Sequence, residues 1–243
     1  MMKPAAKSGL RTRYRVMKNT LVVDLGGTGL VLSSAPQGGG FAHARYLLNH
    51  QVEANPTGSL NRHAHGDPVR YLRTLASTLG VSKETVGLMT AVPMTALVTA
   101  RASSGPVWVE CFATVGVTNA VCAGERPKTR AQKRQVSGAG TINLIVVTNA
   151  SLSSSAMVGA VQVATESKTG VLRDHAVPSW TGNPDATGTG TDAVAIVCRK
   201  RGEGPWQLYS GTHTMLGAMI GQVVRTCVSR GLAKITRRRE QQA

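Results

Sequence analysis

Residues 140–172 read GTINLIVVTNASLSSSAMVGAVQVATESKTGVL, and this stretch sets the expected fold. The apolar run Thr141–Thr148 has the length of a strand without the alternation of a half-exposed one. It therefore predicts a strand that is covered on both faces. Ser153 then begins a helix that continues to about Leu172, with apolar residues recurring at helical spacing. A covered strand followed by such a helix predicts a sheet with helices packed on it.

The segments on either side supply further strands and two more helices. Asp67 is expected to cap a helix that has Pro68 at its first position and Gly80 just past its end. A C-terminal helix is expected over Thr214–Leu232. Strands are expected at Val86–Val92, Ala96–Ala100, Val107–Val115 and Ala193–Cys198, a strand or helix at Phe41–Asn49, and a hairpin where Thr20–Asp24 and Leu30–Ser34 flank Gly26–Gly29. Together these elements favour an α+β fold: one layered domain with a mixed or antiparallel sheet, hairpins and at least three helices.

The net charge of +16 is unevenly distributed over the 243 residues. Eighteen of the 28 basic residues fall in clusters at 1–18, 126–134, 199–201 and 234–239, and the body of the chain is close to neutral. Tyr14 is the single aromatic residue within these clusters, which is too few for a base-stacking surface, so nucleic-acid binding is not favoured. We expect a basic, flexible tail over 1–18, a domain over 19–233 and a basic C-terminal tail over 234–243. Solvated surface charge explains the clusters, with weak attraction for an anionic substrate as a second reading.

Composition also bears on compartment. No stretch approaches the ~18 consecutive apolar residues of a membrane span, and the basic N-terminus lacks the apolar segment of a secretory signal. The four cysteines have neither the spacing of a zinc site nor that of a disulfide framework. These features predict reduced thiols in a cytoplasmic protein, with a homo-oligomer left open.

One lysine stands out on the helix that begins at Ser153. Lys168 falls in the middle of its apolar stripe, whereas Glu166 points nearly the opposite way. A lysine centred on a buried face must extend to solvent, pair with a carboxylate or lose its proton. Lys168 is therefore either a snorkelling side chain or a functional one.

A glycine- and threonine-rich loop precedes the strand at Ala193. Its hydroxyls and N–H groups form a dense set of hydrogen-bonding groups over 187–191, and glycines allow close approach of a ligand. Asp192 ends the loop at the start of the rigid strand, where a catalytic carboxylate can be held firmly. A structural turn is the alternative.

Two other motifs have simpler explanations. The run 24–29, DLGGTG, resembles the phosphate-binding hairpin of sugar kinases and actin-like ATPases, but an ordinary turn accounts for it. His63, His65 and Asp67 could surround a metal ion. Asp67 is already explained as a helix cap, so a solvated loop is favoured, and no cofactor is expected to be required.

A series of short motifs follows in order along the chain: Gly38–Gly40, Asn49–Val52, Gly87–Val92, Thr118–Ala120, Ala123-Gly124, Gly140–Asn143, Ala164–Thr169, Ala186–Asp192, Gly211–Thr214 and Leu216-Gly217. Any one motif is weak, but their ordered combination over about 20–230 is specific. Taken together, the motifs resemble the adenosylcobinamide amidohydrolase family of corrinoid salvage. Ser167 departs from the family's alanine.

The resemblance implies hydrolysis of one amide on a cobalt corrinoid. Adenosylcobinamide, its phosphate or a related complete corrinoid would lose its aminopropanol arm and give adenosylcobyric acid for cobalamin salvage. The substrate itself carries the cobalt. A corrinoid-binding protein without turnover, a nucleic-acid-binding protein and a metal-dependent hydrolase are the alternatives.

Chemistry then suggests roles for the polar residues. Asp192 is the expected base, Lys168 with the N–H groups of 188–191 the oxyanion site, and His213 the proton donor to the leaving amine. Glu166 is a reserve base, and a threonine nucleophile at Thr141, Thr189 or Thr191 is the competing mechanism. The residues expected to bind substrate are Asn49, Asn119, Asn143, Gly188, Thr189, Gly190 and Thr191.

Overall fold

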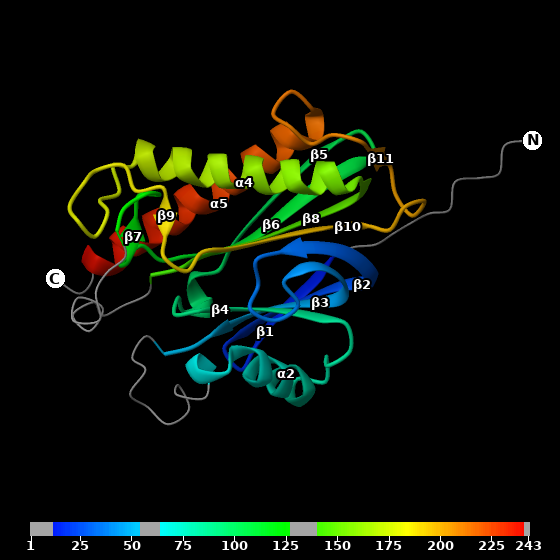
Figure 1. Cartoon of the computed structure of the whole chain (residues 1–243), viewed down its shortest axis with the longest axis horizontal. Coiled ribbons are helices and arrows are strands. Elements are labelled where there is room, and N and C mark those ends of the chain that lie inside the picture. The colour runs from blue at the N-terminus through cyan, green and yellow to red at the C-terminus, as the bar shows by residue number, and fades with distance from the viewer. Residues whose placement is uncertain (1–11, 54–63, 127–139, 241–243) are drawn as a thin grey trace, which may run out of the picture.

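The computed structural model describes residues 12–53, 64–126 and 140–240. Its elements stack in four layers: two helices, one half of a sheet, the other half of the sheet, and a third helix (Figure 1). The expected α+β class, with a mixed sheet and at least three helices, is confirmed. The expected loop over 55–66 lies largely outside the described residues.

A single hydrogen-bonded sheet forms both middle layers. Its path runs β4-β3-β2-β10-β8-β6-β5, with β1 attached to β2 and β11 to β8. The β3–β4, β8–β10 and β8–β11 pairs are parallel and the other pairs antiparallel. The sheet turns over where β2 pairs with β10, so its two halves face each other. The strands are β1 Arg13–Met17, β2 Thr20–Ser33, β3 Gly40–Gln51, β4 Thr85–Thr90, β5 Val98–Ser104, β6 Val107–Val115, β8 Ile142–Leu152, β10 Ala193–Arg199 and β11 Trp206–Gln207.

The prediction of a hairpin at Gly26–Gly29 is wrong. Residues 20–33 form one continuous strand, β2, and both of its halves pair with the same neighbour, β3. The glycines instead produce an irregularity between Asp24 and Gly29, with Gly26 at φ 70°. Gly29 has no room for a side chain, because an added Cβ would lie 2.9 Å from the carbonyl oxygen of Cys198. These glycines therefore allow a bulge and close strand contact rather than a chain reversal.

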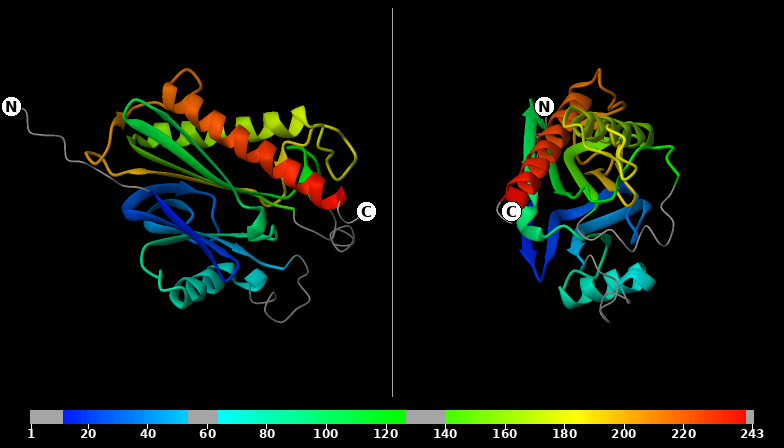
Figure 2. Two further views of the ribbon diagram at one scale, coloured as in Figure 1. Left: turned by 180° about the vertical axis from the view of Figure 1, so that it is seen from behind. Right: turned by 90° about the vertical axis from the view of Figure 1, so that its left-hand side faces the viewer.

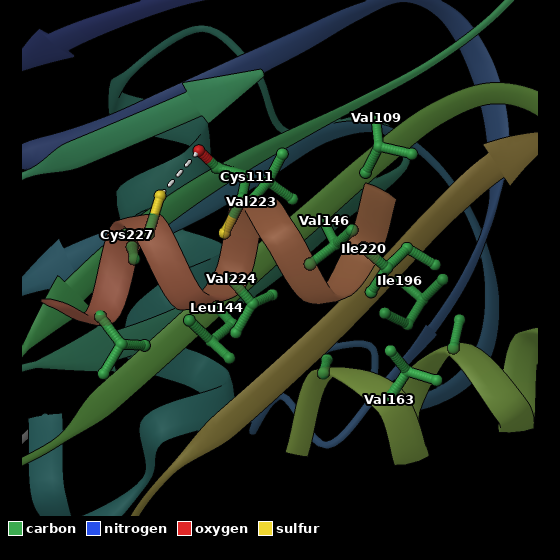
Figure 3. Close-up of a cluster of buried hydrophobic side chains, with 14 of the residues drawn as sticks. Val109, Cys111, Leu144, Val146, Val163, Ile196, Ile220, Val223, Val224 and Cys227 are labelled. Atoms are coloured by element: carbon green, nitrogen blue, oxygen red, sulfur yellow. Dashed lines mark hydrogen bonds between the residues drawn. The ribbon is translucent and has the colours of Figure 1, made fainter. Parts of the chain in front are cut away.

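Two long helices cover the outer face of β5, β6, β8 and β10 (Figure 2). They are α4 (Ser154–Asp174), which begins next to Ser153 close to the expected start and is capped by that residue, and α5 (Met215–Glu240). The core between helices and sheet is aliphatic and sulfur-containing, and in it Cys227 donates a hydrogen bond to the carbonyl oxygen of Cys111 (Figure 3). All four cysteines are free thiols, in agreement with the sequence.

The second core lies between the two halves of the sheet. The alternation of β6 places Phe112 there, and β8 contributes Ile145 and Val147. The fourth layer is α2 (Pro68–Thr78), which packs through Leu72 and Ala76. Its N-terminus is confirmed, because the carboxylate of Asp67 accepts from the backbone N–H of Arg70.

The folded domain extends past both expected boundaries. Residues 13–17 of the expected tail form β1, whose Tyr14 ring meets Phe112 edge-on at 5.1 Å. At the other end α5 continues to Glu240, and the ammonium of Lys234 donates to the carbonyl oxygen of Leu97. Both β1 and the end of α5 pack on the rest of the domain, which the clustering of basic residues in the sequence does not reveal. No helix in the described part of the chain is long and apolar enough to cross a membrane.

Candidate active site

A cavity of about 740 Å³ opens at one end of the sandwich, a typical size for a small-molecule site. It lies where β8 and β10 begin and where β3 and β4 end. The residues expected from sequence that line it are Asn119, Thr141, Gly190, Thr191, Asp192 and His65. Sites at the ends of strands combine a rigid support with variable loops.

The carboxylate of Asp192 accepts four hydrogen bonds at the edge of the cavity. One carboxylate oxygen accepts from the backbone N–H of Ile142 at 2.8 Å and from the hydroxyl of Thr189. The other accepts from the backbone N–H of Thr189 at 3.0 Å and forms a buried ion pair with Lys168. Because each of the two oxygens accepts from two donors, this carboxylate is fully used in holding the loop over 187–191. The geometry therefore disfavours its expected role as a general base.

Lys168 lies behind Asp192 and outside the cavity lining. Of the three outcomes considered for a lysine on the apolar stripe of α4, the structure shows pairing with a carboxylate. Gly188 allows this pairing, because an added Cβ would lie 2.6 Å from Asp192 Oδ2 and 2.7 Å from Lys168 Nζ. The ion pair thus tethers the threonine-rich loop to α4.

A short ladder fixes the same loop to a second one. Strand β7 (Ala120–Val121) pairs antiparallel with β9 (Gly188–Thr189). Thr187 adds a backbone bond to Val121 and accepts from the N–H of Ala123 at 2.8 Å. The two loops that carry Asn119 and Thr191 are therefore held together before any ligand binds.

Two threonine hydroxyls meet in the wall of the cavity. Thr141 Oγ1 and Thr191 Oγ1 are 2.7 Å apart, and Thr191 Oγ1 also lies 3.3 Å from the carbonyl oxygen of Gly140. Thr141 is 8% exposed and shares the inter-sheet side of β8 with Asn143 and Ile145. Of the threonines weighed as nucleophiles, Thr141 and Thr191 therefore face the cavity, whereas the hydroxyl of Thr189 is used by Asp192.

Two polar atoms beside Gly140 have no partner among the described residues. They are Thr118 Oγ1 and Asn119 Oδ1, both fully buried. They sit so close to Gly140 that an added Cβ would be 2.8 Å from the first and 2.1 Å from the second. Thr118 was not singled out from the sequence, although it adjoins Asn119 in the same motif.

Asn49 and Asn143 lie beneath the cavity rather than in its wall. They are 2% and 1% exposed, and Asn143 Nδ2 donates to Asn49 Oδ1 at 2.9 Å. The same nitrogen donates to the carbonyl oxygen of Met89, and Asn49 Nδ2 donates to Thr114 Oγ1. They therefore tie the two halves of the sheet together, which disfavours the expected direct contact with substrate.

Glu125 gives the cavity wall a fixed negative charge. Hydrogen bonds from the hydroxyl of Thr181 and from the backbone N–H of Cys122, with others from Ser179 and Asn183, lower the pKa of Glu125 to about 2. This carboxylate is ionised throughout the physiological range.

His213 and Glu166 are not brought to the cavity. His213 is exposed in the turn before α5, and this turn adjoins the first turn of α4, where Ser210 bonds to the carbonyl oxygen of Ala156. That end of the sandwich is separated from Thr141 by the eleven residues of β8, about 36 Å at ~3.3 Å per residue. Glu166 faces solvent on α4, as its helical position predicts.

The histidine loop is only partly described. His63 lies outside the described residues, His65 borders the cavity, and Asp67 is occupied as the cap of α2. Among residues 12–53, 64–126 and 140–240, no three His, Cys, Asp or Glu side chains cluster as a metal site would require.

The family model for adenosylcobinamide amidohydrolase matches residues 4–240 of the sequence. This chain belongs to that family. The match includes the loops that meet at the cavity, those of Asn119, Thr141 and Asp192.

Two curated relatives align over nearly the whole chain. The uncharacterized protein MJ1613 of Methanocaldococcus jannaschii is 30% identical over 88% of this chain and 86% of its own length. A Methanosarcina mazei protein named adenosylcobinamide amidohydrolase is 29% identical over 90% of this chain and 97% of its own.

Two solved structures show distant similarity. The PH0078 protein of Pyrococcus horikoshii and a Burkholderia β-aminopeptidase are 11% and 10% identical, with TM-scores of 0.43 and 0.45. Each comparison covers 91% of this chain and 79% of the other.

Proposed function

We propose that the chain hydrolyses the amide between the corrin ring and the aminopropanol arm of adenosylcobinamide, of its phosphate or of a related complete corrinoid. Water is consumed, and the products are adenosylcobyric acid and the released amine: aminopropanol from adenosylcobinamide, aminopropanol phosphate from its phosphate, or aminopropanol still joined to the nucleotide from a complete corrinoid. Family membership over 4–240 carries the choice of substrate. The hydroxyl pair of Thr141 and Thr191 in a preformed cavity supports the choice of reaction.

Thr141 is the nucleophile that the geometry favours. Thr141 lines the cavity and directly precedes the rigid strand β8. Asp192, in contrast, has no free lone pair to direct at a water molecule. Attack of Oγ on the amide carbon forms an ester to Thr141 and releases the amine, which takes up the proton. Water then hydrolyses the ester and restores the hydroxyl.

The oxyanion formed in both steps needs hydrogen-bond donors at the cavity surface. Asn119, Gly190 and Thr191 line the cavity, and the amide nitrogen of the first and the backbone N–H groups of the other two are the donors we assign to this role. One well-placed donor contributes about 3–4 kcal/mol to the transition state. Lys168, which was expected here, acts by holding Asp192 and hence the loop.

The test is incubation of the purified protein with adenosylcobinamide, its phosphate and a complete corrinoid, followed by liquid chromatography and mass spectrometry. The proposal expects adenosylcobyric acid from at least one of them, with an equal amount of the amine that this substrate releases (aminopropanol, its phosphate or its nucleotide-bearing form). Thr141→Val should abolish the products, and Thr165→Ala, on the exposed side of α4, is the matched control. Tight binding of all three without any product would support a corrinoid carrier instead.

A further inference from the structure

The cavity contains a nucleophilic hydroxyl whose base is not evident. Among the described residues, the hydrogen bond of Thr141 Oγ1 runs to another hydroxyl, that of Thr191. Asp192 is saturated, Lys168 is paired, and His213 is at the far end of β8. A threonine hydroxyl is a weak nucleophile unless a base removes its proton.

The peptide bond before Thr141 is arranged for attack. The carbonyl oxygen of Gly140 lies 3.3 Å from the hydroxyl of Thr191, which polarises it as a donor. Residue 140 has no side chain to shield the carbonyl carbon. Thr191 also contacts Thr141 Oγ1, so one side chain touches both reacting groups.

The unpartnered acceptors beside this bond indicate that a donor belongs there. Thr118 Oγ1 and Asn119 Oδ1 are buried, lack partners among the described residues and crowd Gly140. Buried acceptors without donors are rare in folded proteins and call for a functional explanation. A free amino group on Thr141, the residue next to Gly140, would add donor hydrogens beside these atoms.

We propose that the chain cleaves its own peptide bond between Gly140 and Thr141. Thr141 Oγ attacks the carbonyl carbon of Gly140, the C–N bond breaks, and the hydroxyl proton passes to the nitrogen, which leaves an ester and a free amine. Water then hydrolyses the ester to the carboxyl group of Gly140 and the hydroxyl of Thr141. One water molecule is consumed, and no other reactant is required.

The cleavage would supply the missing base. An α-amino group has a pKa of about 7.7–8.0, so part of it is neutral at physiological pH. It is attached to the same residue as Oγ and can take the hydroxyl proton when Thr141 attacks a substrate amide. This second step rests on the proposed function, whereas the cleavage itself does not.

The two pieces would stay assembled after cleavage. Residues 1–140 contain β2 and β6, and residues 141–243 contain β8 and β10, which lie between them in the sheet. We therefore expect both pieces to elute together under native conditions and to separate on denaturation.

The experiment is an intact-mass measurement of the full chain after purification and denaturation, with N-terminal sequencing of its fragments. The expected result is two polypeptides, residues 1–140 and 141–243, whose masses sum to that of the chain plus one water. The second should begin Thr-Ile-Asn-Leu. Thr141→Ala should remain one chain, Thr141→Ser should still cleave, and Thr191→Val should cleave about 10²-fold more slowly.

Corrinoid turnover, measured on the same samples, separates this inference from the proposed function. An intact wild-type chain that hydrolyses adenosylcobinamide would overturn the self-cleavage and leave the proposed function standing. A cleaved chain that turns over no corrinoid would support the self-cleavage and overturn the proposed function. Cleavage of Thr141→Ala at the same bond would show a contaminating protease and overturn the inference. If circular dichroism shows that Thr141→Ala is unfolded, the other two variants provide the test: loss of cleavage in Thr141→Ser, or an unchanged cleavage rate in Thr191→Val, would overturn the inference.

Discussion

The two ends of the sandwich both carry glycine- and threonine-rich motifs, but only one end carries the cavity described above. At the cavity end, the loops of Asn119, Thr141 and Thr191 converge around polar atoms that are buried and partly unpartnered. At the opposite end, Gly211–Thr214 forms a turn in which the hydroxyl of Thr214 accepts from the N–H of Gly217 at the start of α5. Similar residues therefore build a site at one end and a helix cap at the other. The site lies at the end of the sandwich where β8 begins, and the helix cap lies at the end where β8 finishes.

The largest expected difference between the ends is in catalysis. Thr141→Val should lower the rate of corrinoid amide hydrolysis by ~10³-fold or more, because it removes the nucleophile. His213→Ala, at the opposite end, should change it by less than about twofold. Single-turnover kinetics on both variants measures the two effects. A comparable loss in His213→Ala would restore its expected role as proton donor and break the comparison.

The ion pair behind the cavity should dominate stability. Asp192→Asn leaves Lys168 buried without its counter-charge and should lower the free energy of unfolding by about 3 kcal/mol. The matched control is Asp174→Asn, which breaks the exposed pair with Arg225 and should cost less than about 1 kcal/mol. Urea denaturation compares them. If Lys168→Met combined with Asp192→Asn is no more stable than Asp192→Asn alone, the pair is not the cause.

Glycine substitutions should show the same asymmetry more weakly. Gly188→Ala places a methyl group 2.6–2.7 Å from the charged atoms of Asp192 and Lys168, and should destabilise the fold by about 1–3 kcal/mol. Gly211→Ala meets nothing within 4 Å and should change stability by less than about 0.5 kcal/mol. Thermal unfolding of both variants tests this. Equal shifts would mean that the loop of Gly188 is not tightly packed.

The smallest effect is a pH dependence. His50 bonds to the hydroxyls of Thr20 at 2.8 Å and Tyr71 at 2.9 Å, and burial lowers its pKa below 6.5. The unfolded chain therefore binds this proton first as pH falls. The contribution of His50 to stability is complete above pH 6.5 and is lost progressively below it, down to the folded pKa.

His50→Gln should flatten that part of the stability curve, whereas the exposed His213→Gln should leave it unchanged. Chemical denaturation at pH 5, 6 and 7 measures the slope. An unchanged slope in His50→Gln would assign the pH dependence to another group.

Local signals predicted much of the fold. Asp67 was identifiable as a cap and Ser153 as the start of a helix, because in each case a short polar side chain precedes an apolar stripe. The glycines at 26–29 led to the wrong prediction of a hairpin. A glycine-rich break between two apolar runs also fits a bulge within one strand, if a partner strand pairs with both halves. That partner, β3, is a long-range feature that no local pattern contains.

The site was predicted less completely. Lys168 was conspicuous because a charge at a buried helical position needs a partner, but the sequence did not identify Asp192 as that partner. The ordered motifs also suggested that His213 joins the site, because order along the chain does not reveal which end of the sandwich a turn occupies. The unpartnered atoms of Thr118 and Asn119 exist only once two distant loops meet.

The central claim is that amide hydrolysis occurs at Thr141. The most direct test is rapid acid quenching of the protein with excess adenosylcobinamide, followed by peptide mass spectrometry. The account predicts a transient adduct with the mass of adenosylcobyric acid minus water on the residue at position 141, absent from Thr141→Val. Formation of adenosylcobyric acid without an adduct, together with full activity in Thr141→Val, would contradict it.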